Sequence, residues 1–125
     1  MKFDPECVRD ILIATEERTD GESMEWLIPG PVGAASVPGL SAYPYNVAVY
    51  HIKQCAQSGL IKLGSDYIDY SFELTDLTPR GHQLLADLRK PQAMKLWEKA
   101  KNAGILASID SVVSWALGIG EMLLK

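Results

Sequence analysis

Apolar residues recur along the chain with two different periods, which predict a series of helices and strands. From Val8 to Thr15 they recur every three or four positions, the spacing of a helix with one buried face. Asp4 can cap this helix, Pro5 suits its first position, and the helix is expected to end near Thr19. Apolar residues then alternate from position 24 to position 28, which indicates a short strand with one buried face.

The next segment, residues 29–44, has a composition that opposes both helix and sheet. It contains four of the seven prolines of the chain together with three glycines. We expect a long extended loop, which is either functional or a tolerated surface insertion.

A second helix is predicted from Asn46, its cap, to Gly59, where glycine can take the left-handed conformation that ends helices. Two strands follow, with a turn expected at Gly64, Ser65 and Asp66. The expected buried stripe of the helix consists of Ala48, Ile52, Cys55, Ala56 and Gly59. The hairpin is expected to direct Ile68, Tyr70, Phe72 and Leu74 inward and Tyr67, Asp69, Ser71 and Glu73 outward.

A third helix begins at Pro79, with Thr78 as its cap, and Pro91 interrupts it. A short fourth helix restarts there and ends at Gly104. The residues expected to be buried on these two helices are Leu84, Leu85, Leu88, Met94, Trp97 and Ala100.

The order helix, strand, helix, hairpin, helix is that of a winged helix. The sequence therefore predicts an α+β fold, with a winged-helix-like domain over residues 1–90 and a C-terminal helical extension over residues 91–125. The extension either packs on the domain or dimerises.

The C-terminal segment has an unusually broad apolar face. Asp110 and Glu121 argue against a membrane-spanning helix, and a serine-rich polar face without lysines argues against a membrane-surface helix. We favour a homodimer held by this segment, with packing inside the chain as the alternative. The seam of the expected contact consists of Ile105, Ile109, Val112, Ala116, Ile119 and Leu123.

Length and composition favour one intracellular domain. The chain has 125 residues, of which 47% are hydrophobic. Cys7 and Cys55 lack the spacing of a zinc site and are expected to be reduced thiols, and the charged start "MKFDPECVRD" does not resemble a signal peptide. We expect a cytoplasmic protein.

Catalysis is the function class with the least support. His51 and Cys55 are four positions apart on one helix and could supply half of a metal site, but packing in the core is the simpler interpretation. His82, in the first turn of a helix, is expected to be a neutral residue hydrogen-bonded beneath the hairpin. Nucleophile and phosphate-binding motifs are missing from the sequence. We expect no enzyme activity, no metal and no cofactor.

The predicted winged-helix-like fold favours DNA binding through the second helix, whereas the net charge of this part of the chain opposes it. Residues 1–78 hold five basic and twelve acidic residues, a net charge of −7, whereas residues 79–125 hold seven and four, a net charge of +3. Affinity for a duplex depends largely on neutralising phosphates. The candidate residues for contact with DNA or with another partner are Asn46, Tyr50, Lys53, Gln54, Gln57, Arg80, Lys95 and Lys99.

Three segments, "YHIKQCAQSGLI", "LTPRGHQLLADLR" and "LWEKAK", together resemble the domain-of-unknown-function family 2513 of bacteria and prophages. The resemblance covers roughly residues 4–104, and it implies a winged-helix-like fold without an assigned chemistry. The insert 29–44 is longer than the family pattern, and Cys55 stands where a larger aliphatic residue is usual. The residues that fit the pattern are Tyr50, His51, Gly59, Thr78, Gly81, His82, Leu84, Leu85, Trp97 and Lys101.

These observations favour a non-enzymatic protein-interaction or regulatory module associated with phage or prophage, with an unidentified protein partner. The alternative is a DNA-binding transcriptional regulator that uses the helix 46–58 and the 60–74 wing.

Overall fold

The chain forms five helices and three strands over the residues that the computed structural model describes, which are 2–18, 24–27, 43–66 and 71–124. Most of the insert 29–44, and the hairpin tip with Tyr67 to Tyr70, lie outside these ranges. The elements are α1 (Pro5–Arg18), β1 (Met24–Leu27), α2 (Tyr45–Gln57), β2 (Ile61–Asp66), β3 (Ser71–Leu77), α3 (Pro79–Leu88), α4 (Pro91–Asn102) and α5 (Ile109–Leu124).

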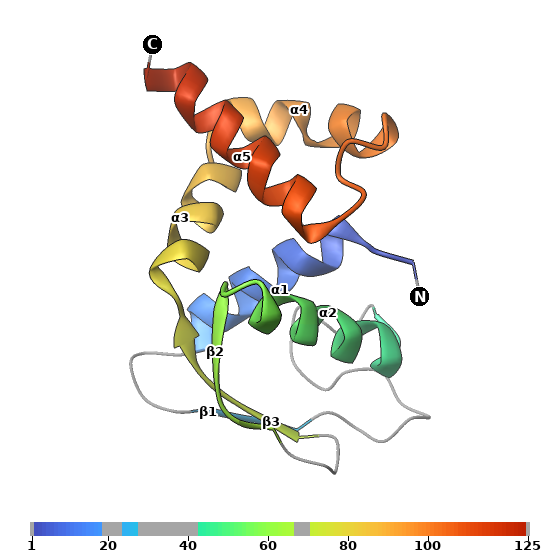
Figure 1. The fold of residues 1–125 in the computed structure, drawn as a ribbon, viewed down its shortest axis with the longest axis vertical. Coiled ribbons are helices and arrows are strands. Elements are labelled where there is room, and N and C mark those ends of the chain that lie inside the picture. The colour runs from blue at the N-terminus through green and yellow to red at the C-terminus, as the bar shows by residue number, and fades with distance from the viewer. Residues whose placement is uncertain (1, 19–23, 28–42, 67–70, 125) are drawn as a thin grey trace.

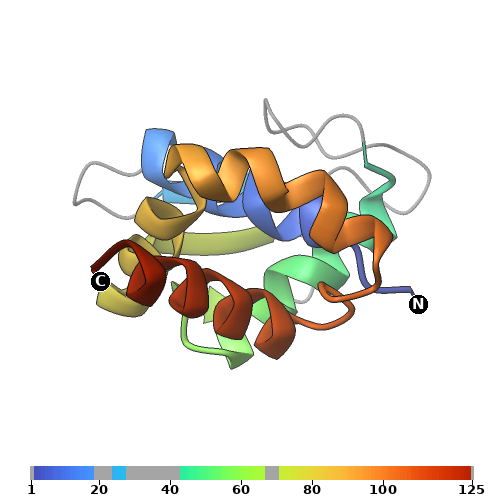
Figure 2. The same ribbon diagram turned by 90° about the horizontal axis from the view of Figure 1, so that it is seen from above.

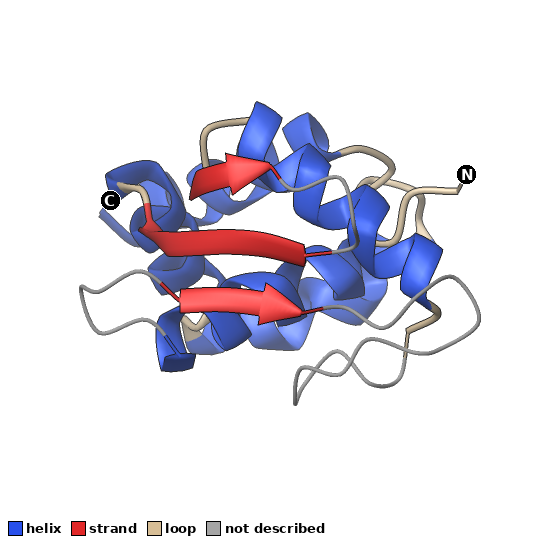
Figure 3. Ribbon diagram, turned by 90° about the horizontal axis from the view of Figure 1, so that it is seen from below, coloured by secondary structure: helices blue, strands red, loops and turns tan. Residues whose placement is uncertain are grey.

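The three strands form one antiparallel sheet in the order β1-β3-β2. The central strand β3 pairs Phe72 with Trp26 of β1 and Leu77 with Ile61 of β2. The described helices all lie on one face of this sheet (Figure 3). The fold is therefore α+β, with helices segregated on one side of a small antiparallel sheet.

Helix α1 lies in the middle of the molecule, between the sheet and the C-terminal helices α4 and α5 (Figure 1). It contacts α2, α3 and α5 as well as β3. Seen from above, α4 overlies α1, and α5 lies beside α4 (Figure 2). One continuous hydrophobic core joins residues of α1, such as Ile11, to residues of α5, such as Val112. The segments 1–90 and 91–125 thus share a single core.

Several predicted boundaries are confirmed. The Asp4 carboxylate accepts the N–H of Glu6 at the start of α1. Helix α3 begins at Pro79 with Thr78 as its cap, and α4 begins at Pro91. The leucines Leu84, Leu85 and Leu88 of α3 are buried as expected.

Two predicted details around α2 and the hairpin are wrong. Helix α2 begins at Tyr45, because the Pro44 carbonyl accepts the first helical N–H groups, so Asn46 lies exposed within the helix. Gly64 does not form the hairpin turn, because β2 continues to Asp66. The pairing of β2 with β3 shifts register on both sides of Leu63, so Gly64 belongs to a bulged part of the strand.

Two details of the C-terminal helices also differ from the prediction. Met94 is 56% exposed, and Ala93 occupies the buried position of α4 instead. The apolar segment from position 105 is not one helix: Gly104 has a φ of +77°, turns follow it, and α5 begins only at Ile109. No helix in the described ranges is long and apolar enough to cross a membrane.

Candidate functional site

Three residues of the family pattern hold the end of α2 against the start of α3. Gly59 has a φ of +73°, which glycine adopts without steric cost and which turns the chain out of α2. Its carbonyl accepts the hydroxyl of Thr78 at 2.5 Å, while the Thr78 oxygen accepts the N–H of Gly81 at 3.0 Å. A Cβ atom on Gly81 would lie 2.0 Å from the Leu60 carbonyl oxygen, so only glycine fits there.

His51 of the same pattern is fully buried and fixes the N-terminal segment. Its Nε2 accepts the backbone N–H of Asp4 at 2.8 Å, so its Nδ1 carries the proton and donates to the Val47 carbonyl at 2.7 Å. Phe3 and Tyr50 pack against the ring at centroid distances of 5.5 and 4.9 Å. Both ring nitrogens are thereby used for structure, as the packing interpretation of His51 predicted.

Trp97 and Lys101, the last residues of the pattern, join α4 to α1. The Trp97 indole N–H donates to Glu6 Oε1 at 2.6 Å, and Lys101 Nζ donates to the same oxygen at 2.9 Å. Arg9 lies over the Trp97 ring, and Trp115 of α5 packs on it edge to face. Burial acts to raise the pKa of Glu6, but the two hydrogen bonds and the charges of Lys101 and Arg9 outweigh it, so this pKa lies below its usual value.

The other candidate chemical groups are inert or exposed. Burial raises the pKa of the Cys7 thiol to about 12 and also raises the pKa of Cys55, so both remain protonated at neutral pH. His82 does not lie beneath the hairpin but at the surface, with Nε2 3.7 Å from Asp76 Oδ1. Within the described ranges, no three His, Cys, Asp or Glu side chains gather closely enough to hold a metal ion.

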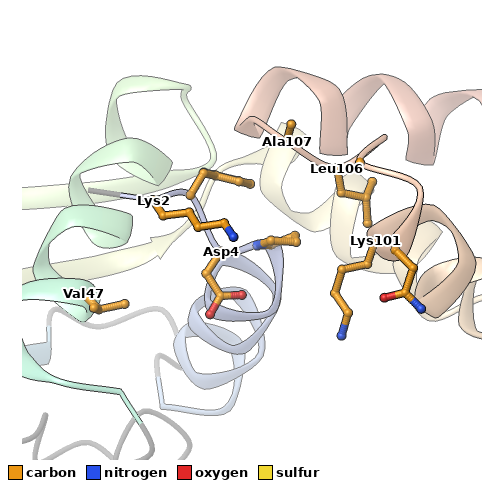
Figure 4. Close-up of a pocket in the computed structure, with 10 residues that line it drawn as sticks. Lys2, Asp4, Val47, Lys101, Leu106 and Ala107 are labelled. Atoms are coloured by element: carbon orange, nitrogen blue, oxygen red, sulfur yellow. The ribbon is translucent and has the colours of Figure 1, made fainter.

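A cleft of 570 Å³ opens where the N-terminal segment meets α2 and the connection between α4 and α5 (Figure 4). Val47 and Leu106 supply apolar wall, and Lys2, Asp4 and Lys101 supply charge. The Lys101 ammonium is already bound by two glutamates, Glu6 and Glu98. The Asp4 carboxylate accepts a backbone N–H of α1. The cleft therefore has the volume of a ligand site, but Lys101 and Asp4 already serve the fold.

The comparison with protein families assigns the chain on nearly its whole length. A family described as "Hypothetical protein (DUF2513)" matches residues 2–109. The chain belongs to the DUF2513 family. No curated protein and no solved structure matches it. Apart from His82, which lies at the surface, the pattern residues described above serve the architecture of this DUF2513 chain, since they cap helices, fill the core or link α1 to α4.

The residues predicted to contact DNA or another partner lie in two places on this DUF2513 chain. Asn46, Lys53 and Gln57 are exposed on α2, where Tyr50 and Gln54 are half-buried. Arg80, at the start of α3, is brought toward the end of α2 by the bond between Thr78 and Gly59. Lys95 and Lys99 are exposed on α4, at the end of the molecule away from the sheet and α2 (Figure 1).

The seam predicted for a dimer is used largely within the chain. Ile109, Val112 and Ala116 are buried in the common core, which is the intramolecular alternative of the prediction. Ile105 precedes α5 and is 51% exposed. The side chains of Ile119 and Leu123 lie outside the described part of the structure.

Two apolar hollows flank α5, and sequence reasoning did not find either of them. The first, of 410 Å³, lies between α4 and α5 beneath Ile105. The second, of 370 Å³, lies between α3 and α5 beside Leu117, which is 50% exposed. Met94, Ile105 and Leu117, the large apolar side chains exposed in the described ranges, all belong to the C-terminal segment. Helical spacing shows which residues share a face, but not which part of that face a neighbouring helix covers.

Proposed function

We propose that this DUF2513 chain is a non-enzymatic, winged-helix-like module that binds another protein and acts as a regulator in phage or prophage biology. The order α1, β1, α2, β2, β3, α3 and the pairing of β1 with β3 support the winged-helix-like interpretation. The free thiols of Cys7 and Cys55 suit the reducing conditions of the cytoplasm.

The use of polar groups for structure supports a role without catalysis. Both ring nitrogens of His51 form hydrogen bonds with backbone groups, and the Glu6 carboxylate accepts hydrogen bonds from Trp97 and Lys101. A catalytic acid, base or nucleophile needs a free atom within hydrogen-bond reach of a substrate. Both ring nitrogens of the buried His51 are occupied, and Oε1 of the half-buried Glu6 already accepts two hydrogen bonds.

The exposed hollow between α4 and α5 is the observation that carries the proposal. Half of the Ile105 side chain is exposed above it, and Trp115 forms part of its wall. Lys99 lines its edge, and Lys95 is exposed one turn earlier on α4. An amphipathic helix with an apolar face and acidic flanks complements this surface, because its face can fill the hollow while its carboxylates meet the lysines.

Affinity capture from the native host, with and without nuclease, tests this proposal. A protein partner should remain bound after nuclease treatment. Ile105→Asp should weaken its binding at least about tenfold, because it places a charge in the apolar contact. Ala86→Asp adds the same charge at an exposed position of α3 and should leave binding unchanged. Loss of the partner on nuclease treatment, or indifference to Ile105→Asp, contradicts the proposal.

DNA binding is the second candidate, favoured by the exposed Asn46, Lys53 and Gln57 on α2 and by Arg80 near its end. The net charge of −7 on residues 1–78 opposes it. Fluorescence anisotropy with a labelled duplex separates the two functions. For an interaction module, affinity should be negligible at about 150 mM salt. For a regulator, binding should fall steeply with salt, and Lys53→Ala should weaken it more than Lys95→Ala.

A further inference from the structure

The groove between α3 and α5 has an apolar wall and a carboxylate at its floor. Leu84 and Val113 are buried along it, and Leu117 forms an edge with half of its side chain exposed. Asp87 also lines the groove, although its side chain is only 3% exposed. A charged floor beneath an apolar wall selects an occupant that supplies both an apolar group and a hydrogen-bond donor.

The hydrogen bonds of Asp87 leave one of its oxygens available. Gln83 Nε2 and Lys90 Nζ both donate to Oδ1, at 3.2 and 3.0 Å. No donor in the described part of the chain reaches Oδ2. A buried carboxylate oxygen without a donor is costly, so a donor that enters the groove with an occupant gains more there than it would at the open surface.

The chain itself carries the two groups that such an occupant needs. Arg80 lies on the same face of α3 as Asp87, seven residues before it, or about 10 Å along the helix axis. A two-fold axis between two antiparallel copies of α3 would place each Arg80 against the Asp87 of the other copy. Leu117, half exposed at the edge of the same groove, supplies the apolar group.

We propose that the groove between α3 and α5 is an isologous interface for a second copy of this chain. In the dimer, Arg80 of one protomer donates to Oδ2 of the partner's Asp87, and Leu117 packs between the two grooves. This inference refines the proposed interaction role of the C-terminal helices but uses the opposite side of α5 from the hollow beneath Ile105.

Light scattering of the purified full-length chain at micromolar concentration tests the interface. The expected mass is twice 13.7 kDa. Leu117→Asp should give a monomer, because it places a charge in the apolar contact of both copies. Ile105→Asp is the matched control, since Ile105 is 51% exposed but lies outside the groove, and it should remain dimeric. Partner capture and dimerisation therefore respond to different variants, so the failure of one proposal is distinguishable from failure of the other.

A charge reversal at Arg80 tests its pairing with Asp87. It also tests the dimer interface independently if the Leu117→Asp variant does not fold. Arg80→Glu should raise the dimer Kd about a hundredfold, one factor of ten for each of the two symmetric pairs. Lys95→Glu reverses a charge of α4 outside the groove and should leave the Kd unchanged. A monomeric wild type, a dimer broken by Ile105→Asp instead, or a groove that binds only a different protein would each overturn the proposal.

Discussion

Replacing Gly81 by alanine tests how tightly the end of α2 is held against α3. The new methyl carbon would lie 2.0 Å from the Leu60 carbonyl oxygen. That oxygen must move by about 1 Å to reach even a tight contact of 3.0 Å. It also accepts the N–H of Thr78 at 3.0 Å, so the movement strains the hydrogen bond that positions the cap of α3.

The expected loss follows from three contributions. Overpacking in a tightly packed region costs about 1–3 kcal/mol. Weakening of the backbone hydrogen bond adds about 1 kcal/mol. Alanine recovers about 1 kcal/mol, because it favours the helix more than glycine does. The free energy of unfolding should therefore fall by about 1–3 kcal/mol.

Urea unfolding followed by circular dichroism measures this change, with Gly118→Ala as a matched control. A Cβ atom on Gly118 meets nothing within 4 Å, so the same substitution in α5 should raise the free energy of unfolding by about 0.5–1 kcal/mol. Both variants are measured at the same protein concentration. If Gly81→Ala is as stable as the wild type, or if both substitutions stabilise, the contact with Leu60 is not a constraint on the fold.

Three further predictions concern the link between α1 and α4 and the buried thiols. Trp97→Phe removes the hydrogen bond to Glu6 and should lower the free energy of unfolding by about 1–3 kcal/mol, more than Trp115→Phe, which leaves that bond intact. Folding lowers the pKa of Glu6, so its ionised carboxylate stabilises the folded state at pH values above 4.5, the pKa of the unfolded chain, and this stabilisation is lost as the pH falls through the folded pKa. Glu6→Gln should therefore reduce the loss of stability at acid pH, measured as the free energy of unfolding against pH. Cys7 and Cys55, whose pKa values are raised by burial, should resist iodoacetamide at pH 8 until the chain is unfolded, and rapid labelling of the native protein would contradict their burial.

The features of the fold that sequence predicted well depend on neighbours along the chain. Thr78 and Pro79 mark the start of α3, and Pro91 marks the start of α4. A capping hydroxyl and a proline ring both act on the backbone next to them, so these boundaries were predictable. Gly59 ended α2 for the same local reason. The order of elements and the α+β class follow from such boundaries together with the apolar periodicity.

The features that were missed depend on contacts between distant segments. The hydroxyl of Tyr43 donates to Asp10 at 2.5 Å, which holds the residue before Pro44 on α1, and the helix then begins ahead of Asn46. Gly64, Ser65 and Asp66 have the composition of a turn. They nevertheless belong to β2, because Ser65 and Asp66 pair with β3. Pairing across a sheet thus overrides local turn preference.

The candidate surfaces were predictable only in part. The exposed polar face of α2 followed from its helical period, whereas the hollows beside α5 required knowledge of how α3 and α4 pack on it. The burial of Asp87 could have been predicted, because this residue lies between Leu84 and Leu88 at the edge of an apolar stripe. The role of Glu6 could not have been predicted from the sequence, because its partner Trp97 is 91 positions away.

That separation between Glu6 and Trp97 bears on how the protein is made. A nascent chain leaves the ribosome from its N-terminus, so α1 emerges long before the Trp97 indole that bonds to its Glu6. Contacts between such distant positions slow folding, because a large loop must close before they contribute. Although α1 precedes the other described helices along the chain, its set of native neighbours is complete only after α4 and α5 have been synthesised. A ribosome-stalled chain that ends before Lys101 should therefore expose α1 to proteases and chaperones.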